Sequence, residues 1–333
     1  MVLLISSSND ASTDAVMDWI DYLGGAAKRV NTDKLSPMDI QALRVSNNKG
    51  EQLYQDGNSH NRFTSVWFRR PATNIFKEEV PMHAIEDRAT SHLVNKFLEF
   101  EAERITDYIY YIYNNCAKTK LGNPFLSSVN KLEILSKACY HGLQIPETII
   151  TANKPELIKF KNRYKDIITK AIYETPTLNP NGKLYKIYTE VVTDEIIEQC
   201  PETFFPSLFQ EKLEKEVELR VFYLNGQFHA AAIFSQNDEQ TAIDFRRYNT
   251  KKPNRKVPFN LPAHVENNLH ALMVDIGLNS GSIDLILAEK GEYVFLEINP
   301  VGQYGMISQY SNAILSKEIA KFLLNHENEM QHT

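Results

Sequence analysis

Two apolar segments near the end of the chain, each interrupted by an acidic residue, constrain the fold more than any other feature. They read GSIDLILAEK (281–290) and EYVFLEINP (292–300), and their composition is typical of buried strands. A two-residue turn at Lys290-Gly291 would join them, so we expect an antiparallel hairpin. Counting back from that turn places Asp284 directly opposite Glu297.

The two opposed acids predict a metal site. Directly opposed residues have Cβ atoms about 4.5–5.5 Å apart, so two carboxylates there repel each other unless a cation lies between them. Asn299 follows Glu297 by two residues and shares its face of the strand. We expect Mg²⁺ to be held by Asp284, Glu297 and Asn299, with phosphate oxygens completing its shell. Two alternatives are a solvated sheet face and a register slipped by one residue, which would separate the acids.

Two lysines are candidates for phosphate contacts. Lys170 lies among apolar residues in DIITKAI and needs an anionic partner there. Lys131 begins a segment with a helical pattern, and the free N–H groups of a helix start also favour anions. The ordinary alternatives are a solvated first-turn lysine at 131 and a lysine at 170 that reaches solvent from a sheet edge.

A second hairpin, VELRVFYLNGQFHAAAIFS, turns at Asn225-Gly226. In its register Arg220 faces Ala231 and Glu218 faces Ile233, so neither meets an opposite charge across the hairpin. Arginine binds phosphate or carboxylate in bidentate fashion, and small partners leave room for such a ligand. A simple Glu218–Arg220 surface pair is the alternative.

The first part of the chain has the pattern of a βαβ unit, which predicts an α/β N-terminal domain within an α/β (α+β) protein. VLLIS (2–6) and AAKRVN (26–31) are strand-like, and Ser12 or Thr13 could cap the helix between them. The apolar residues of that helix recur at i, i+3, i+4 and i+7, and they are Val16, Trp19, Ile20 and Leu23. A later helix, 127–142, is expected to bury Leu132, Leu135 and Cys139.

Composition narrows the functional class. The hydrophobic share of 43% and the charged share of 23% are those of a soluble globular protein, and a net charge of −6 argues against a nucleic-acid-binding surface. The three cysteines form no metal-binding or disulfide spacing, so we expect buried thiols in a reducing cytoplasm. The start lacks the pattern of a signal peptide, and no apolar run approaches the ~20 residues of a membrane span.

Five segments in order carry a family resemblance. They read NKLEILSKACYHGLQIPET, DIITK, FQEKLEKEVELRVF, DFRRYN, and GSIDLIL with YVFLEINP. This order resembles the ATP-grasp ligases, most closely their RimK-type branch. The opening SSSNDASTDAVMDWIDYLG, the SVWFRRP segment and the NPVGQYG ending are similar to the peptide maturases that make graspetides (omega-ester or omega-amide cross-linked peptides), particularly the grasp-with-spasm group.

The resemblance implies an ATP-grasp fold with three domains and a nucleotide site. The implied domains are a preATP-grasp domain (1–120), a central domain (121–205) and a C-terminal ATP-grasp domain (206–333). The residues implied to contact ATP are Lys131 and Lys170 at the phosphates, Glu211, Lys212 and Leu213 at the adenine, and Glu218 at the ribose. Arg220 and Arg246 would stabilise the transferred phosphate together with Lys170. Asp284, Glu297 and Asn299 would hold Mg²⁺, as two ions.

The implied reaction joins two side chains of a ribosomal precursor peptide in the cytoplasm. A Glu or Asp carboxylate is phosphorylated by ATP, and a Thr or Ser hydroxyl or a Lys amine then displaces the phosphate. Arg69 and Arg70 could recognise the acidic core of the peptide, with a solvated strand-end pair as the alternative. The segment TEVVTDEIIEQC (189–200) is the weak candidate for binding the leader peptide, and the family implies a homodimer.

The sequence departs from the ATP-grasp pattern at one point, and three other functions stay open as alternatives. YETPTLNPNGKLY (173–185) contains only Gly182, whereas many ATP-grasp enzymes cover the phosphates there with a glycine-rich loop. The first rival is a RimK-like ligase that adds amino acids to a protein or metabolite. The second is a nucleotide-binding regulator without turnover, and the third is a metal hydrolase, against which the lack of a nearby His cluster argues.

Overall fold

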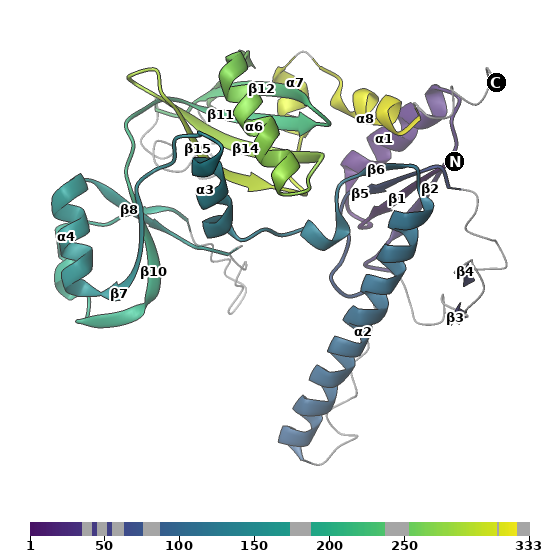
Figure 1. The fold of residues 1–333 in the computed structure, drawn as a ribbon, viewed down its shortest axis with the longest axis horizontal. Coiled ribbons are helices and arrows are strands. Elements are labelled where there is room, and N and C mark those ends of the chain that lie inside the picture. The colour runs from purple at the N-terminus through teal and green to yellow at the C-terminus, as the bar shows by residue number, and fades with distance from the viewer. Residues whose placement is uncertain are drawn as a thin grey trace. The chain divides into compact units, whose positions relative to one another are not determined.

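The computed structural model describes residues 1–34, 42–44, 52–54, 63–75, 87–173, 188–236, 253–311 and 313–324. The chain divides into two compact units. The first unit is Met1–Ser127 with Ile314–Thr333, and the second is Ser128–Ala313. The α/β class expected from the sequence is confirmed by the mixture of helices and sheets in both units (Figure 1).

The first unit is built on a parallel sheet with strand order β2-β1-β5-β6. Its strands are β1 (Val2–Ser6), β2 (Ala27–Asn31), β5 (Ser65–Phe68) and β6 (Thr119–Leu121). A separate two-stranded antiparallel pair is formed by β3 (Ala42–Arg44) and β4 (Gln52–Tyr54). Every residue of β1 is buried, as parallel sheets covered on both faces require.

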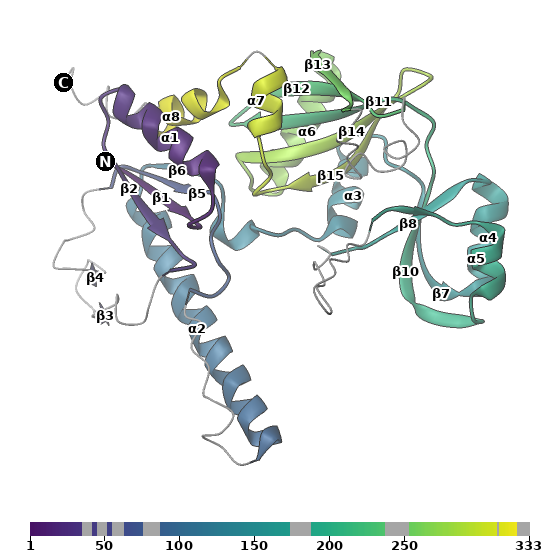
Figure 2. The same ribbon diagram turned by 180° about the vertical axis from the view of Figure 1, so that it is seen from behind.

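Three helices cover this sheet (Figures 1 and 2). They are α1 (Ala11–Tyr22), α2 (Arg88–Cys116) and α8 (Leu315–Leu324). Leu3 and Ile5 of β1 pack in one cluster with Ile109 and Tyr113 of α2. Helix α8 packs against α1 and strands β5 and β6, and Lys317 lies 4.9 Å over the ring of Trp19. Helix α8 therefore packs within the first unit, whereas the resemblance implies one C-terminal domain over 206–333.

The second unit contains an antiparallel sheet of order β7-β10-β8-β9. Its strands are β7 (Thr148–Asn153), β8 (Ile167–Lys170), β9 (Glu190–Val191) and β10 (Thr203–Glu211). Helices α4 (Lys154–Tyr164) and α5 (Asp194–Gln199) contribute Leu157 and Ile197 to a core with Ile167 and Phe209. The domain boundary expected at 205/206 falls inside β10, so the three-domain division stays a prediction.

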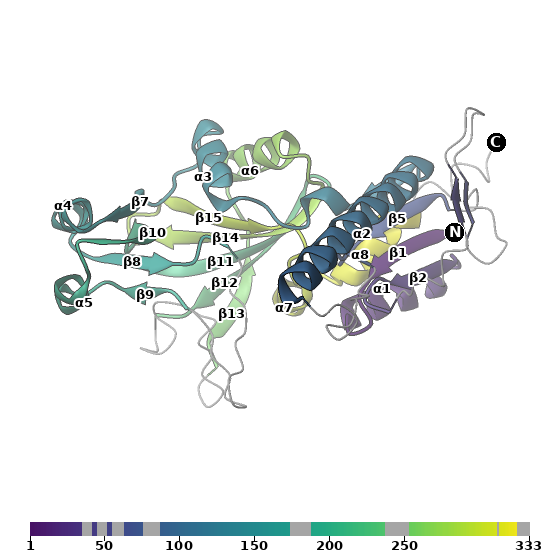
Figure 3. The same cartoon turned by 90° about the horizontal axis from the view of Figure 1, so that it is seen from below.

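A five-stranded antiparallel sheet of order β13-β12-β11-β14-β15 completes the second unit (Figure 3). Its strands are β11 (Lys215–Leu224), β12 (Gln227–Phe234), β13 (Arg255–Phe259), β14 (Ser280–Ala288) and β15 (Tyr293–Asn299). The helices of this part of the chain are α3 (Lys131–Tyr140), α6 (Ala263–Asp275) and α7 (Gly305–Tyr310). A short 3₁₀ helix (Pro124–Leu126) precedes them and belongs to the first unit. Helix α3 contacts both β15 and α6.

Three expectations about local structure were wrong. Helix α1 is capped by Asp10, whose carboxylate accepts a hydrogen bond from the Ser12 amide (3.2 Å), and not by Ser12 or Thr13. Helix α3 buries Ile134, Leu135 and Ala138, which turns Cys139 outward. The cysteines are not buried small hydrophobes, since Cys116 and Cys139 are exposed and Cys200 is half-buried.

Candidate active site

The central strands of the five-stranded sheet place three charged side chains in one row. Arg220 of β11 is paired with Asp284 of β14, and Asp284 is paired with Glu297 of β15. The expected opposition of Asp284 and Glu297 is therefore confirmed. The expectation that Arg220 faces no opposite charge is wrong, because β11 has a neighbour on each side: Ala231 lies opposite on β12, as expected, while Asp284 lies opposite on β14.

The hairpin that opposes the two acids differs from the expected one in two ways. The Ala288 amide donates to the Glu292 carbonyl (2.9 Å), so the loop contains three residues and not two. The register then shifts between Asp284 and Leu285, which leaves Leu296 as the extra residue of a β-bulge. The bulge offsets the longer loop and restores the opposition of the acids. Bulges beside active sites often aim a side chain in this way.

Each acid of the row is bound by a cation. Arg220 Nη1 lies 3.3 Å from Asp284 Oδ2, and Lys131 Nζ lies 3.1 Å from Glu297 Oε2. Lys131 is the first residue of α3, as expected, but it is not a solvated first-turn lysine because its side chain is only 24% exposed and paired. The row thus reads arginine, carboxylate, carboxylate, lysine, with the two anions in the middle.

The next row on the same face contains Asn299, opposite Ser282. The Asn299 side-chain oxygen accepts a hydrogen bond from the Val301 amide (3.1 Å), and the Gly302 amide donates to the Asn299 carbonyl (3.0 Å). This tight turn stops the strand and fixes the amide beside the two acids. A carbonyl oxygen has two lone pairs, so the turn leaves one for a cation.

Gly302 is required by the close approach of this turn to β14. A Cβ atom at position 302 would lie 2.3 Å from Ser282 Oγ and 2.4 Å from Ser282 Cβ. We expect Gly302→Ala to lower the free energy of unfolding by about 1–3 kcal/mol through overpacking. Hydrogen exchange of the β14 and β15 amides would measure it.

A second substitution, at Ser282, should restore the protection that Gly302→Ala loses. Adding Ser282→Gly removes both clashing atoms, so the double variant should recover most of the protection lost in Gly302→Ala. Ser282→Ala keeps the Cβ atom and should not rescue. Equal protection in Gly302→Ala and the wild type would show that the turn does not depend on this contact.

Glu218 lies one row away from the acids on the other side. Its carboxylate forms an ion pair with Lys215 and accepts a hydrogen bond from the Ser235 hydroxyl (2.7 Å). The side chains of Lys215 and Glu218 are 8% and 12% exposed, and Ile233 faces Glu218 as expected. The Glu218–Arg220 surface pair is not what the structure shows: Glu218 is held by Lys215 and Arg220 by Asp284.

The residues expected at the adenine lie where β10 leaves its sheet. Glu211 ends β10, and its side chain accepts a hydrogen bond from the Glu147 amide (3.0 Å). The Lys212 amide donates to the Asp166 carbonyl (2.8 Å), while Leu213 is half-buried in the segment before β11. Lys170 is the last residue of β8, not a mid-strand residue, and pairs with Leu208 of β10.

Two kinds of feature are absent from the described ranges. No cluster of three or more His, Cys, Asp or Glu side chains is arranged to hold a metal there, so the two acids would need the amide and ligand oxygens to complete a shell. No helix among these residues is both long and apolar enough to cross a membrane.

Comparison with known proteins identifies the fold that carries this site. No family model matches the sequence. The Chryseobacterium gregarium RiPP-associated ATP-grasp ligase, solved in complex with ADP and a leader and core peptide, is 25% identical, has a TM-score of 0.78, and matches over 98% of this chain and 96% of that one. The chain has the fold of the ATP-grasp ligases.

Two further proteins are similar to this chain. The macrocyclase MdnC of Microcystis aeruginosa, solved with the precursor peptide MdnA, is 27% identical to this chain with a TM-score of 0.76, over 98% of this chain and 100% of that one. The uncharacterized protein MJ0776 of Methanocaldococcus jannaschii is 28% identical over 205 residues, which are 60% of this chain and 46% of that protein. The chain thus spans about half the length of this curated relative.

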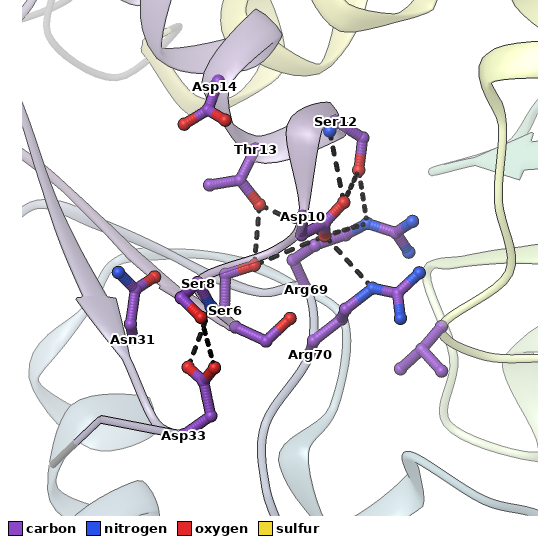
Figure 4. A network of polar contacts seen from close by, with 12 residues as sticks. Ser6, Ser8, Asp10, Ser12, Thr13, Asp14, Asn31, Asp33, Arg69 and Arg70 are labelled. Atoms are coloured by element: carbon purple, nitrogen blue, oxygen red, sulfur yellow. Dashed lines mark hydrogen bonds and ion pairs between the residues drawn. The ribbon is translucent and has the colours of Figure 1, made fainter. Parts of the chain in front are cut away.

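The first unit of the chain contains a second charged cluster, centred on Asp10 (Figure 4). Asp10 Oδ2 lies 3.2 Å from the Nε atoms of both Arg69 and Arg70. Burial would raise the pKa of Asp10, but the hydrogen bond from Ser12 and the charges of the two arginines outweigh it and hold this pKa below its usual range. The side chain of Arg69 is 4% exposed and that of Arg70 is 38% exposed, so the alternative of two solvated charges is wrong for Arg69.

Sequence reasoning missed two parts of these sites. It did not find Asp10 as the partner of the two arginines, although an aspartate just before a helix pattern is a recognised capping signal. It also did not pair Lys131 with Glu297, since nothing in the spacing of residues 131 and 297 links them. Arg246 and Gly182 lie outside the described residues.

Proposed function

We propose that this protein is an ATP-dependent ligase that forms macrocycles in a ribosomal precursor peptide. A Glu or Asp side chain of the peptide attacks the γ-phosphate of ATP, so that an acyl phosphate forms and ADP leaves. A Thr or Ser hydroxyl, or a Lys amine, of the same peptide then attacks the activated carbonyl, and phosphate leaves as the ester or amide bond forms. The row from Arg220 to Lys131 carries this proposal, together with the likeness to ligases solved with leader, core or precursor peptides.

The donor set fits Mg²⁺, since two opposed carboxylates and an amide oxygen are hard ligands at one edge of the sheet. Bound there with ATP, the ion would neutralise charge on the phosphates and polarise the γ-phosphate toward attack. Asp284, Glu297 and Asn299 would hold it. That two ions bind, and that the ligase is a homodimer of the grasp-with-spasm group, remain predictions.

The side chains of the ligase supply positioning and charge. Lys131, Lys170 and Arg220 would bind phosphate oxygens, where cations stabilise the charge that develops in transfer. Glu218 is fixed by Lys215 and Ser235, which orients its carboxylate for ribose hydroxyls. Holding both reacting groups of one peptide makes ring closure effectively unimolecular.

Arg70 is the better candidate for recognising acidic side chains of the peptide. It follows β5 at the point where the strand order β2-β1-β5-β6 changes direction, and ligands of open α/β sheets bind outside the carboxyl ends of strands at such points. Asp10 pairs with its Nε atom, and the Arg70 side chain is 38% exposed, so its guanidinium group could also bind a carboxylate of the peptide. The buried Arg69 would fix Asp10 instead of touching the peptide.

The test is incubation of the ligase with ATP, Mg²⁺ and any candidate precursor peptide that is encoded beside its gene. We expect the peptide to lose one water per bond formed, measured by mass spectrometry, and ADP release to depend on the peptide. Transfer of free amino acids with no change in the peptide would favour the RimK-like ligase. Nucleotide binding without any acceptor-dependent ADP release would favour the regulator.

A further inference from the structure

Each of the two opposed acids is paired, through one of its carboxylate oxygens, with a cation of the ligase itself. Glu297 Oε2 is 3.1 Å from Lys131 Nζ, and Asp284 Oδ2 is 3.3 Å from Arg220 Nη1. The four side chains are between 17% and 29% exposed, so water screens these pairs less than it screens pairs on an open surface. The row carries two negative and two positive charges and is neutral overall.

A neutral row is a poor site for a free divalent cation. Such an ion beside Glu297 would be repelled by the ammonium group of Lys131 at a few ångströms, and the repulsion is strong in a partly desolvated site. Nucleotide phosphates change this balance because they offer the lysine and the arginine an alternative anionic partner. The phosphates then replace the acids as partners of the two cations. In the same step the metal replaces the cations as the partner of the acids.

We propose that Lys131 is an exchange residue that couples metal binding to nucleotide binding: it holds Glu297 until phosphate oxygens draw it away as the metal takes its place. This inference rests on the proposed function. Lys131 is the more mobile of the two cations, because its flexible four-carbon side chain extends from the first turn of α3, whereas Arg220 lies in a central strand. The ligase therefore takes up the nucleotide together with its metal and binds free metal weakly.

The test measures Mn²⁺ binding, with the free ion followed by electron paramagnetic resonance, in the absence and presence of ADP. In Lys131→Met, which keeps the length of the side chain but not its charge, the affinity for Mn²⁺ without nucleotide should rise on the order of tenfold. The affinity for ADP should fall by a similar factor. The factor by which ADP tightens Mn²⁺ binding should therefore shrink.

The matched control is Lys137→Met on the same helix. Lys137 Nζ lies 3.3 Å from Asp275 Oδ2, away from the acid row, and the substitution removes the same charge. It should leave Mn²⁺ affinity within about twofold of the wild type if only the net charge changes. Lys131→Arg, which restores a cation, should return the low affinity for free Mn²⁺.

Each outcome decides between the two proposals. A wild type that binds Mn²⁺·ADP, with a Lys131→Met variant that binds free Mn²⁺ no better, overturns the exchange role and leaves the proposed function standing. A wild type that binds neither ADP nor Mn²⁺·ADP overturns the proposed function itself. Opposite changes in Mn²⁺ and ADP affinity in Lys131→Met, absent in Lys137→Met, support the exchange.

Discussion

Glu297→Gln is expected to reduce peptide-dependent ADP release by about 10³-fold or more, because it removes one of the two opposed carboxylates that would hold the metal. The glutamine side chain has nearly the same size as glutamate. Its amide oxygen can still accept a hydrogen bond from Lys131 Nζ, which lies 3.1 Å from Glu297 Oε2 in the wild type. We therefore expect the fold to survive. Steady-state ADP release and the circular dichroism spectrum of the variant would measure both effects.

Glu292→Gln is the matched control for this substitution. Glu292 lies in the same hairpin, just before β15, and its side chain is exposed. The control makes the same chemical change away from the acid row, so its activity should stay within twofold of the wild type. Full activity in Glu297→Gln would remove Glu297 from the mechanism and with it the proposed metal site.

The opposed acids could be predicted from the sequence, but not for the reason that the structure gives. The loop after Ala288 is one residue longer than a two-residue turn, with Gly291 at φ +81° as such three-residue loops favour. The bulge at Leu296 compensates for it. A bulge leaves no clear mark in a run of apolar residues. The expected turn was one residue too short and the expected strand lacked the bulge, and these two errors cancel at Asp284 and Glu297.

The partners of the two cations could not be predicted, because they come from strands and helices far apart in sequence. Hairpin counting gives Arg220 its neighbour on β12, but the partner strand β14 lies some sixty residues later. In the same way, β10 is inserted between β7 and β8, and α8 packs against α1. Local patterns predict strands and helices, while strand order depends on the packing of the whole unit.

The second large effect concerns Asp10, which compensates two arginines in the first unit. Asp10→Asn keeps a side chain that caps helices well, so the change isolates the lost charge. It leaves Arg69, 4% exposed, without its carboxylate, and removing one member of a buried ion pair costs about 3 kcal/mol. Trp19 and Trp67, the only tryptophans in the sequence, both lie in the first unit, so tryptophan fluorescence in urea reports its unfolding.

Asp14→Asn provides the comparison for this change. Asp14 lies in the first turn of the same helix and pairs with Arg29, but its side chain is 62% exposed. Exposed pairs contribute about 0–1 kcal/mol, so this variant should unfold close to the wild type. Equal losses in the two variants would show that burial of the Asp10 cluster does not contribute to stability.

The stability that Asp10 provides should also depend on pH, and its direction follows from the lowered pKa. The hydrogen bond from Ser12 and the charges of Arg69 and Arg70 outweigh the effect of burial, so folded Asp10 holds its proton less tightly than unfolded Asp10. Its contribution is complete above the unfolded pKa of about 3.9 and is lost as the pH falls through the lower folded value. The difference in unfolding free energy between the wild type and Asp10→Asn should therefore be constant from pH 7 to about 5 and shrink toward pH 3. A difference that grows as the pH falls would mean that the carboxylate is not ionised in the folded cluster, and that the two arginines are held in some other way.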